Sequence, residues 1–239
     1  MTWSIAAFDP PTGAFAVCVA TRALAVGASC PFVRAGVGAV STQSITNRYL
    51  GPAVLDGLAA GLAPEAAVRR ALERDEGRGM RQLHAVDGQG RSFAWTGDNC
   101  VSWCGAVRAE NVSIAGNMLS GPAVIEATLS AYLAAVDLDL PGRLLAAMDA
   151  GEAAGGDRRG RQSAAMQIVT SEDFPDLDLR VDDHVQPLAE LRRLVGLWRG
   201  QAAIRKGWAP TKANPSGETD LDAIEARWIA QGLDIRFRR

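Results

Sequence analysis

The chain has 239 residues, of which 48% are hydrophobic, so it is long and apolar enough to bury a full core. Lys and Arg total 25 against 27 Asp and Glu, which excludes the strong overall field that draws proteins to nucleic acid or to anionic membranes. No apolar run approaches the roughly 18–20 residues of a membrane span, and the N-terminus lacks a signal-peptide pattern, so we expect a cytoplasmic protein with no nucleic-acid or membrane partner.

The first forty residues predict short strands. Trp3–Phe8 and Ala14–Ala20 are β-rich runs on either side of the turn sequence Asp9–Gly13, and they predict a hairpin. Cys30–Arg34 and Gly36–Thr42 follow, and their small residues indicate close packing against another layer. The N-terminus is therefore expected to lie in a sheet.

From Gly51 onward, helices and strands are predicted in blocks. Ala and Leu at helical spacing predict two pairs of helices, with a β-hairpin between the pairs and further strands after them. The predicted helices are 52–60, 64–73, 122–135 and 141–154, and the predicted strands are 81–86, 91–95, 107 with 112–115, 163–170 and 178–181. Blocks without strict βαβ alternation predict an α+β fold, a four-layer αββα sandwich of two mainly antiparallel sheets flanked by helices.

The last part of the chain predicts a small separate module. A helix with leucines at 188, 191 and 194 leads into a loop that contains Pro and Gly, and a final amphipathic segment covers 221–229. We therefore expect a main domain over residues 1–200 and a small helical tail over 201–239.

Thr2 is the candidate that decides the chemistry. It follows Met1 directly, and small second residues such as Thr are those after which an initiator methionine is normally removed. A free N-terminal threonine supplies nucleophile and base together, because its α-amine, with an ordinary pKa of about 7.7–8.0, can take the hydroxyl proton. Many unrelated proteins begin with Met-Thr, but here Thr2 opens a predicted core strand that would hold both groups in place.

Three residues are candidate partners of Thr2. Arg22 and Arg34 each end an apolar strand, where a cation would favour the neutral amine and stabilise a developing anion. An arginine that reaches from a strand end into water is the alternative. Asn117 lies between a strand and a helix, where its amide could face an oxyanion or cap the next helix.

The densest polar cluster is Gly155–Ser163, immediately before a buried strand. Its arginines, with Arg158 and Arg161 as candidates, could clamp a substrate carboxylate beside Asp157. The alternative is a solvated loop in which Asp157 pairs with its neighbours. Gln43 is a further candidate for substrate binding.

Two other groups of residues could hold a metal ion, although we favour a structural role for both. Zinc at Cys100 and Cys104 would need two further ligands, and the only histidines are His84 and His184. The acidic stretch over 173–183 lacks EF-hand spacing, and Asp182 or Asp183 is expected to cap the following helix. We expect reduced thiols, no metal and no cofactor.

Six stretches of the chain together resemble the family known as domain of unknown function 1028, which is assigned to the N-terminal nucleophile (Ntn) hydrolase superfamily. They cover residues 2 to about 195 and are Thr2–Ala7, Val19–Arg22, Gly36–Gln43, Gly116–Leu119, Gly155–Ala164 and Asp178–His184. The resemblance implies the αββα fold and, through the wider superfamily, cleavage of amide bonds. It implies no substrate, because the family has no settled one.

The resemblance also assigns individual positions. Thr2 matches the nucleophile. Arg34 lies 32 positions after it, where proteasome-like members carry an active-site lysine, whereas bile-salt-hydrolase-like members use an arginine nearer the place of Arg22. The tail is similar to a peptidoglycan-binding module that some relatives append.

The leading hypothesis is a homo-oligomeric amidohydrolase that acts on a small amide, such as an N-acyl or N-carbamoyl amino acid or a short peptide. Thr2 would attack the carbonyl, Asn117 would stabilise the oxyanion, and arginines would bind the substrate carboxylate. Two alternatives stay open. One is a catalytically silent binding or scaffold protein on the same fold, and the other is a hydrolase that uses a metal held by the aspartates near His184.

Overall fold

The fold is built on two antiparallel sheets. The computed structural model describes residues 2–205, 207–233 and 236–237. The first sheet has the strand order β10-β9-β2-β1-β8-β7, and the second has the order β3-β4-β5-β6. Their strands are β1 (Thr2–Asp9), β2 (Ala14–Thr21), β3 (Pro31–Arg34), β4 (Gly38–Ser44), β5 (Arg81–Asp87), β6 (Ser92–Thr96), β7 (Gly105–Ala109), β8 (Val112–Asn117), β9 (Ser163–Val169) and β10 (Leu177–Val181).

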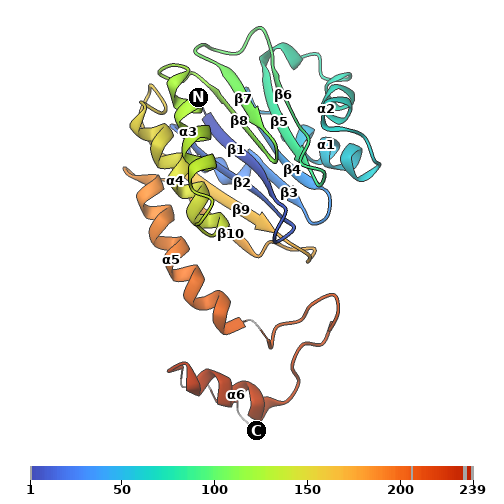
Figure 1. The fold of residues 1–239 in the computed structure, drawn as a ribbon, viewed down its shortest axis with the longest axis vertical. Coiled ribbons are helices and arrows are strands. Elements are labelled where there is room, and N and C mark those ends of the chain that lie inside the picture. The colour runs from blue at the N-terminus through green and yellow to red at the C-terminus, as the bar shows by residue number, and fades with distance from the viewer. Residues whose placement is uncertain (1, 206, 234–235, 238–239) are drawn as a thin grey trace. The chain divides into compact units, whose positions relative to one another are not determined.

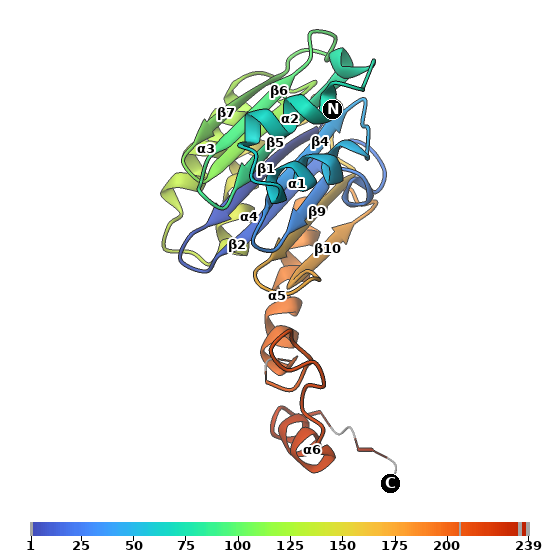
Figure 2. The same ribbon diagram turned by 90° about the vertical axis from the view of Figure 1, so that its right-hand side faces the viewer.

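The two sheets are stacked and each is covered by a pair of helices (Figures 1 and 2). The helices α1 (Leu50–Ala59) and α2 (Pro64–Leu72) pack on the second sheet, whereas α3 (Ala123–Ala134) and α4 (Leu140–Ala153) pack on the first. The predicted α+β arrangement of two antiparallel sheets flanked by helices is confirmed.

Sequence signals explain where these helices begin and end. Pro64 occupies the first turn of α2, where a missing N–H leaves no hydrogen bond unmade. The Asp139 side chain caps α4 by accepting a hydrogen bond from the Gly142 N–H at 3.0 Å. Gly155 and Gly156 follow α4 with φ values of 115° and 49°, a conformation that glycine adopts readily. These glycines end the helix within one residue of its predicted end at 154.

Contacts divide the chain into a first unit that ends at Arg192 and a second that begins at Arg193. The division falls within α5 (Pro187–Arg205), a few residues before the predicted boundary at 200. The second unit also contains α6 (Leu221–Ala230), where the ring of Trp228 contacts those of Trp208 and Phe237 at centroid distances of 5.6 and 5.7 Å. None of the helices among the described residues is both long and apolar enough to cross a membrane.

Gly151 allows α4 to approach α3 and β1 closely. A Cβ at this position would overlap Thr128 Oγ1 and lie 3.0 Å from Trp3 Nε1. Neither neighbour can move away easily, because Thr128 Oγ1 donates a 2.6 Å hydrogen bond to the Val124 carbonyl and Trp3 is 1% exposed. The close contact therefore requires glycine.

We predict that Gly151→Ala lowers the free energy of unfolding by about 1–3 kcal/mol, because the extra methyl overpacks the core. Urea unfolding followed by circular dichroism measures the change. Gly121→Ala is the control in the same unit, because a Cβ there would meet nothing within 4 Å, and it should stay within about 0.5 kcal/mol of the wild type. Equal stability of the two variants would contradict the packing argument.

Candidate functional site

Thr2 begins β1, an interior strand of the first sheet, and is held on both sides. It pairs with Thr21 at the end of β2 and with Asn117 at the end of β8. Thr2 is 7% exposed, and its hydroxyl donates to Thr21 Oγ1 at 3.2 Å. The sheet therefore fixes the position of this hydroxyl, as expected for a candidate nucleophile.

A layer of buried polar side chains lies between the two sheets beside Thr2. Ser4, two residues along β1, lies within hydrogen-bond distance of Ser41 Oγ at 3.0 Å, Gln43 Oε1 at 2.8 Å and His84 Nε2 at 2.7 Å. All four residues are fully buried. Because Thr2 and Ser4 project from the same face of β1, Thr2 lies at the end of this polar layer.

Gln43 and Gln82 connect the layer to the backbone around Thr2. The Gln43 amide donates to Gln82 Oε1 at 2.8 Å, to the Ala115 carbonyl at 3.1 Å and to the Thr2 carbonyl at 3.5 Å. The Gln82 amide donates to the Gly116 carbonyl at 2.8 Å. Gln43 therefore lies beneath Thr2, where it supports the strand.

Asn117, the residue opposite Thr2, belongs to the same network. It is fully buried, and its Nδ2 donates to Gln82 Oε1 at 3.0 Å. Its Oδ1 accepts no hydrogen bond from any described residue. This geometry gives the side chain an unused acceptor next to Thr2 and commits one of its two N–H groups to Gln82.

Sequence reasoning missed Gln82, His84 and Ser41 as parts of the site. In β4 and β5 they occupy every second position, as Ser41 and Gln43 and as Gln82 and His84. Alternating polar residues are usually assigned to a solvent-facing side. Here they face the other sheet, and the alternation alone does not show this.

His84 is neutral in this layer. Burial lowers its pKa from 6.5 to about 3, and the Ser113 backbone opposes the shift weakly. Its Nδ1 makes no hydrogen bond with the described residues. The contacts of the Thr2 hydroxyl and carbonyl described above are likewise with uncharged groups, Thr21 and Gln43.

Arg22 follows Thr21 directly, but its side chain points to the loop over residues 155–162. The Arg22 backbone N–H donates to Asp157 Oδ2 at 2.7 Å, and its guanidinium donates to Gln162 Oε1 at 2.7 Å. The Asp157 side chain, 1% exposed, also accepts from the Arg159 N–H at 2.8 Å. Asp157 therefore anchors the 155–162 loop to the end of β2.

The two arginine candidates of this loop are both exposed. Arg158 directly follows Asp157 in the chain. Arg161 forms an ion pair with Glu152 of α4 at 3.0 Å. Arg161 and Glu152 line a cavity of about 440 Å³ together with Trp3, Gly155, Gly156, Asp157, Gly160 and Val185. Trp3 and Thr2 are consecutive in β1 and project from opposite faces, so this cavity lies on the helix side of the sheet.

Arg34 is at the other end of the sandwich from Thr2. It pairs with Gly38, the first residue of β4, whereas Gln43 near the end of β4 contacts Thr2. Its guanidinium forms an ion pair with Asp56 of α1 at 2.9 Å. The structure does not bring Arg34 to the candidate nucleophile, because antiparallel pairing sends the end of β3 to the start of β4.

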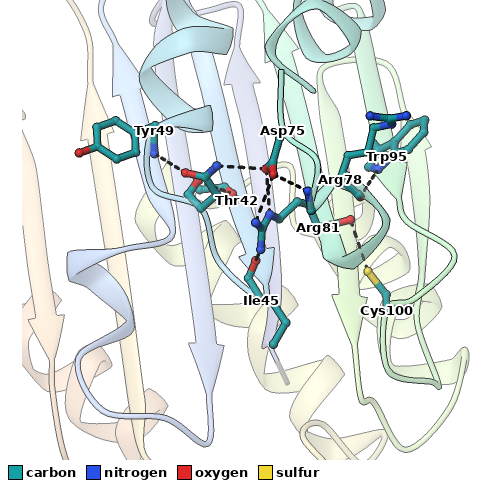
Figure 3. Close-up of polar contacts among 10 residues, drawn as sticks. Thr42, Ile45, Tyr49, Asp75, Arg78, Arg81, Trp95 and Cys100 are labelled. Atoms are coloured by element: carbon teal, nitrogen blue, oxygen red, sulfur yellow. Dashed lines mark hydrogen bonds and ion pairs between the residues drawn. The ribbon is translucent and has the colours of Figure 1, made fainter. Parts of the chain in front are cut away.

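A partly buried ion pair holds together the loops at the Thr2 end of the second sheet (Figure 3). Asp75 accepts from Arg81 Nε at 2.9 Å and from Asn47 Nδ2 at 3.0 Å. Arg81 also donates to the Ile45 carbonyl at 2.7 Å. The Arg81 hydrogen bond is the main reason that the pKa of Asp75 falls to about 2. The segments after β4 and before β5 are thus fixed to each other.

Among the described residues, the cysteines and the aspartates near His184 do not form a metal site. No group of three or more His, Cys, Asp or Glu in the described ranges is arranged to hold a metal ion. The four cysteines are free. Asp182 forms an ion pair with Arg180, and Asp183 accepts from Gln162 Nε2 at 3.1 Å, so the expected capping of α5 by either aspartate is wrong.

The neutral state of buried His84 predicts a dependence of stability on pH. Below pH 6.5 the unfolded chain binds a proton at this position and the folded chain does not until about pH 3, so stability falls as the pH is lowered. We predict that, relative to His84→Gln, the wild type loses roughly 3 kcal/mol of unfolding free energy between pH 7 and pH 4.

Urea unfolding of both proteins across this range measures the difference. Comparison with the variant removes the contribution of Asp75, which also destabilises the fold in acid because its folded pKa is lowered. If the unfolding free energies of the two proteins fall equally as the pH is lowered, His84 is protonated in the folded state.

A family model and one solved structure identify the family of this chain. A family model described as "Family of unknown function (DUF1028)" matches residues 2–191. The crystal structure of protein SPO2555 from Silicibacter pomeroyi, a DUF1028 protein, is similar with a TM-score of 0.85 and 34% identity, covering 92% of this chain and 96% of that one. Anbu (ancestral beta-subunit) from Yersinia bercovieri is similar with a TM-score of 0.37 and 14% identity, covering 88% and 99%. No curated protein matches the chain. The chain belongs to the family of unknown function DUF1028.

Proposed function

We propose that the chain is an Ntn-type amidohydrolase whose nucleophile is the hydroxyl of Thr2. The observation that carries this proposal is the position of Thr2. It starts an interior strand, is paired on both sides, and its hydroxyl is bonded to Thr21 at the end of a buried polar layer. Residues near a chain terminus are usually poorly ordered unless they are tied down in this way.

The mechanism needs a free α-amine on Thr2, which removal of Met1 would supply. Met1 lies outside the described residues. The neutral amine takes the hydroxyl proton as Thr2 Oγ1 attacks the amide carbonyl, and it then gives this proton to the leaving amine. The resulting acyl ester on Thr2 is hydrolysed by water, which regenerates the free threonine.

The surrounding residues support Thr2 in distinct ways. The contacts of Thr2 with Thr21 and Gln43 are uncharged, so no carboxylate among them raises the pKa of the amine. We assign Asn117 a positioning role, in which its unused Oδ1 accepts a hydrogen bond from the amine, in place of the predicted oxyanion contact. Its Nδ2 donates one hydrogen bond to Gln82, and the side chain is fully buried.

The substrate is a small amide that carries a carboxylate, such as an N-acyl or N-carbamoyl amino acid or a short peptide. Arg22 and Arg158 are exposed at the Thr2 end of the first sheet and supply positive charge for this carboxylate. Arg34 has no part in the proposed site, because its position and its pairing with Asp56 keep it at the other end.

We predict that the mature protein begins at Thr2. Intact-mass measurement of protein purified without an N-terminal tag should give a mass lower than the full sequence by one methionine residue. Active protein that retains Met1 would contradict the mechanism, because the amine would then be part of a peptide bond.

We further predict that Thr2 reacts with a β-lactone, whose ring opens when the hydroxyl attacks its carbonyl and forms an ester. Peptide mapping should place the label on Thr2. Thr2→Ala should lower the labelling rate by at least about a thousandfold, whereas Thr2→Ser should retain it.

Thr170→Ala is the matched control, because Thr170 is a half-buried threonine bonded to Asp176 away from this site, and it should label like the wild type. Equal labelling of Thr2→Ala would favour the alternative, a binding or scaffold protein on the same fold.

A further inference from the structure

The cavity beside Trp3 has the features of a separate binding site. Its volume of about 440 Å³ is in the range of small-molecule pockets. It lies against the face of β1 opposite to that of the Thr2 side chain, between the end of α4 and the 155–162 loop. A molecule in this cavity would not need to touch the proposed nucleophile.

The wall of the cavity is shaped by backbone. Gly155, Gly156 and Gly160 have φ values of 115°, 49° and 106°, so a side chain at any of these positions would be strained. Gly156 also lies against the Trp3 indole, because a Cβ there would be 3.4 Å from its ring. The loop thus covers the indole of Trp3, which is 1% exposed, and Val185, 80% exposed, is the apolar side chain that is open to the cavity.

Of the charged residues that line the cavity, Asp157 is already committed to the backbone N–H groups of Arg22 and Arg159. Glu152 and Arg161 remain, and they face each other at 3.0 Å with side-chain exposures of 22% and 47%. A partly exposed ion pair contributes only about 0–1 kcal/mol. The free-energy cost of opening the Glu152–Arg161 ion pair to form two new ion pairs with a ligand is therefore small.

Glu152 occupies an unfavourable place for a carboxylate. It lies in the last turn of α4, where the helix dipole disfavours negative charge. Burial also raises its pKa, and Arg161 opposes this shift. The charged form of Glu152 therefore depends on a cationic partner, which Arg161 provides in this structure and a ligand ammonium could replace.

We propose that this cavity binds a free α-amino acid with an apolar side chain. Its ammonium would pair with Glu152 and its carboxylate with Arg161, and its side chain would lie against Val185. A ligand with both charges matches the pair better than a ligand with one, because either charge alone would leave one member of the opened pair without a partner.

Isothermal titration calorimetry with three matched probes tests the proposal. L-leucine carries both charges, L-leucinol only the ammonium, and 4-methylpentanoate only the carboxylate. We expect L-leucine to bind at least about tenfold more tightly than either analogue, because each loses one charge-assisted contact.

Two variants assign each charge to its partner. In Glu152→Gln the advantage of L-leucine over 4-methylpentanoate should disappear, and in Arg161→Gln its advantage over L-leucinol should disappear. Arg69→Gln is the control, since it breaks an exposed ion pair with Glu65 on α2 and should leave binding unchanged. Circular dichroism checks that each variant is folded.

The proposal is overturned if neither L-leucine nor L-phenylalanine binds in the millimolar range, or if L-leucine binds no better than its single-charge analogues. Its failure is separate from that of the proposed hydrolase. None of the probes contains an amide, and Thr2→Ala should bind L-leucine as the wild type does.

Discussion

The hydrogen bond between the Gln43 and Gln82 side chains is the interaction on which the Thr2 end of the sandwich depends. Both amides are fully buried and come from neighbouring strands of the second sheet, yet each also donates to carbonyls of the first sheet. A buried amide without partners would be destabilising by about 1–3 kcal/mol. The two sheets must therefore stack in the one register that satisfies both amides.

This register determines what surrounds Thr2. It sets Gln43 under the Thr2 carbonyl and fixes Asn117 through Gln82 on the opposite strand. On the outer side of the second sheet, the ion pair between Asp75 and Arg81 fixes the loops at the same end. A polar layer that is only partly satisfied would be a poor way to build a core, but in the proposed mechanism its unused acceptor, Asn117 Oδ1, receives a hydrogen bond from the Thr2 amine.

Much of the fold follows from the sequence because each signal is local. Apolar runs, the Asp9–Gly13 turn and the glycines after α4 each mark an element without reference to the rest of the chain. The placement of Thr2 in an interior strand follows from the same pattern. Arg34 shows where this reasoning stops, since its distance from Thr2 depends on which end of the β3–β4 hairpin lies against the start of β1 in the other sheet, and no local signal reports how the two sheets stack. Gln82 and His84 show a second limit, because alternation identifies a polar face of a strand but not whether water or another sheet covers it.

The alternation of side chains along β1 has a consequence for how its two environments communicate. Thr2 faces the buried polar layer and Trp3 faces the side of the sheet where the cavity lies, so β1 separates two different chemical environments. β1 is paired to β2 and β8 over nearly its whole length, and moving it would disturb both ladders. A ligand on one face can influence the other only through differential affinity for two positions of the strand. With a single position held this firmly, the coupling free energy between the two faces should be close to zero.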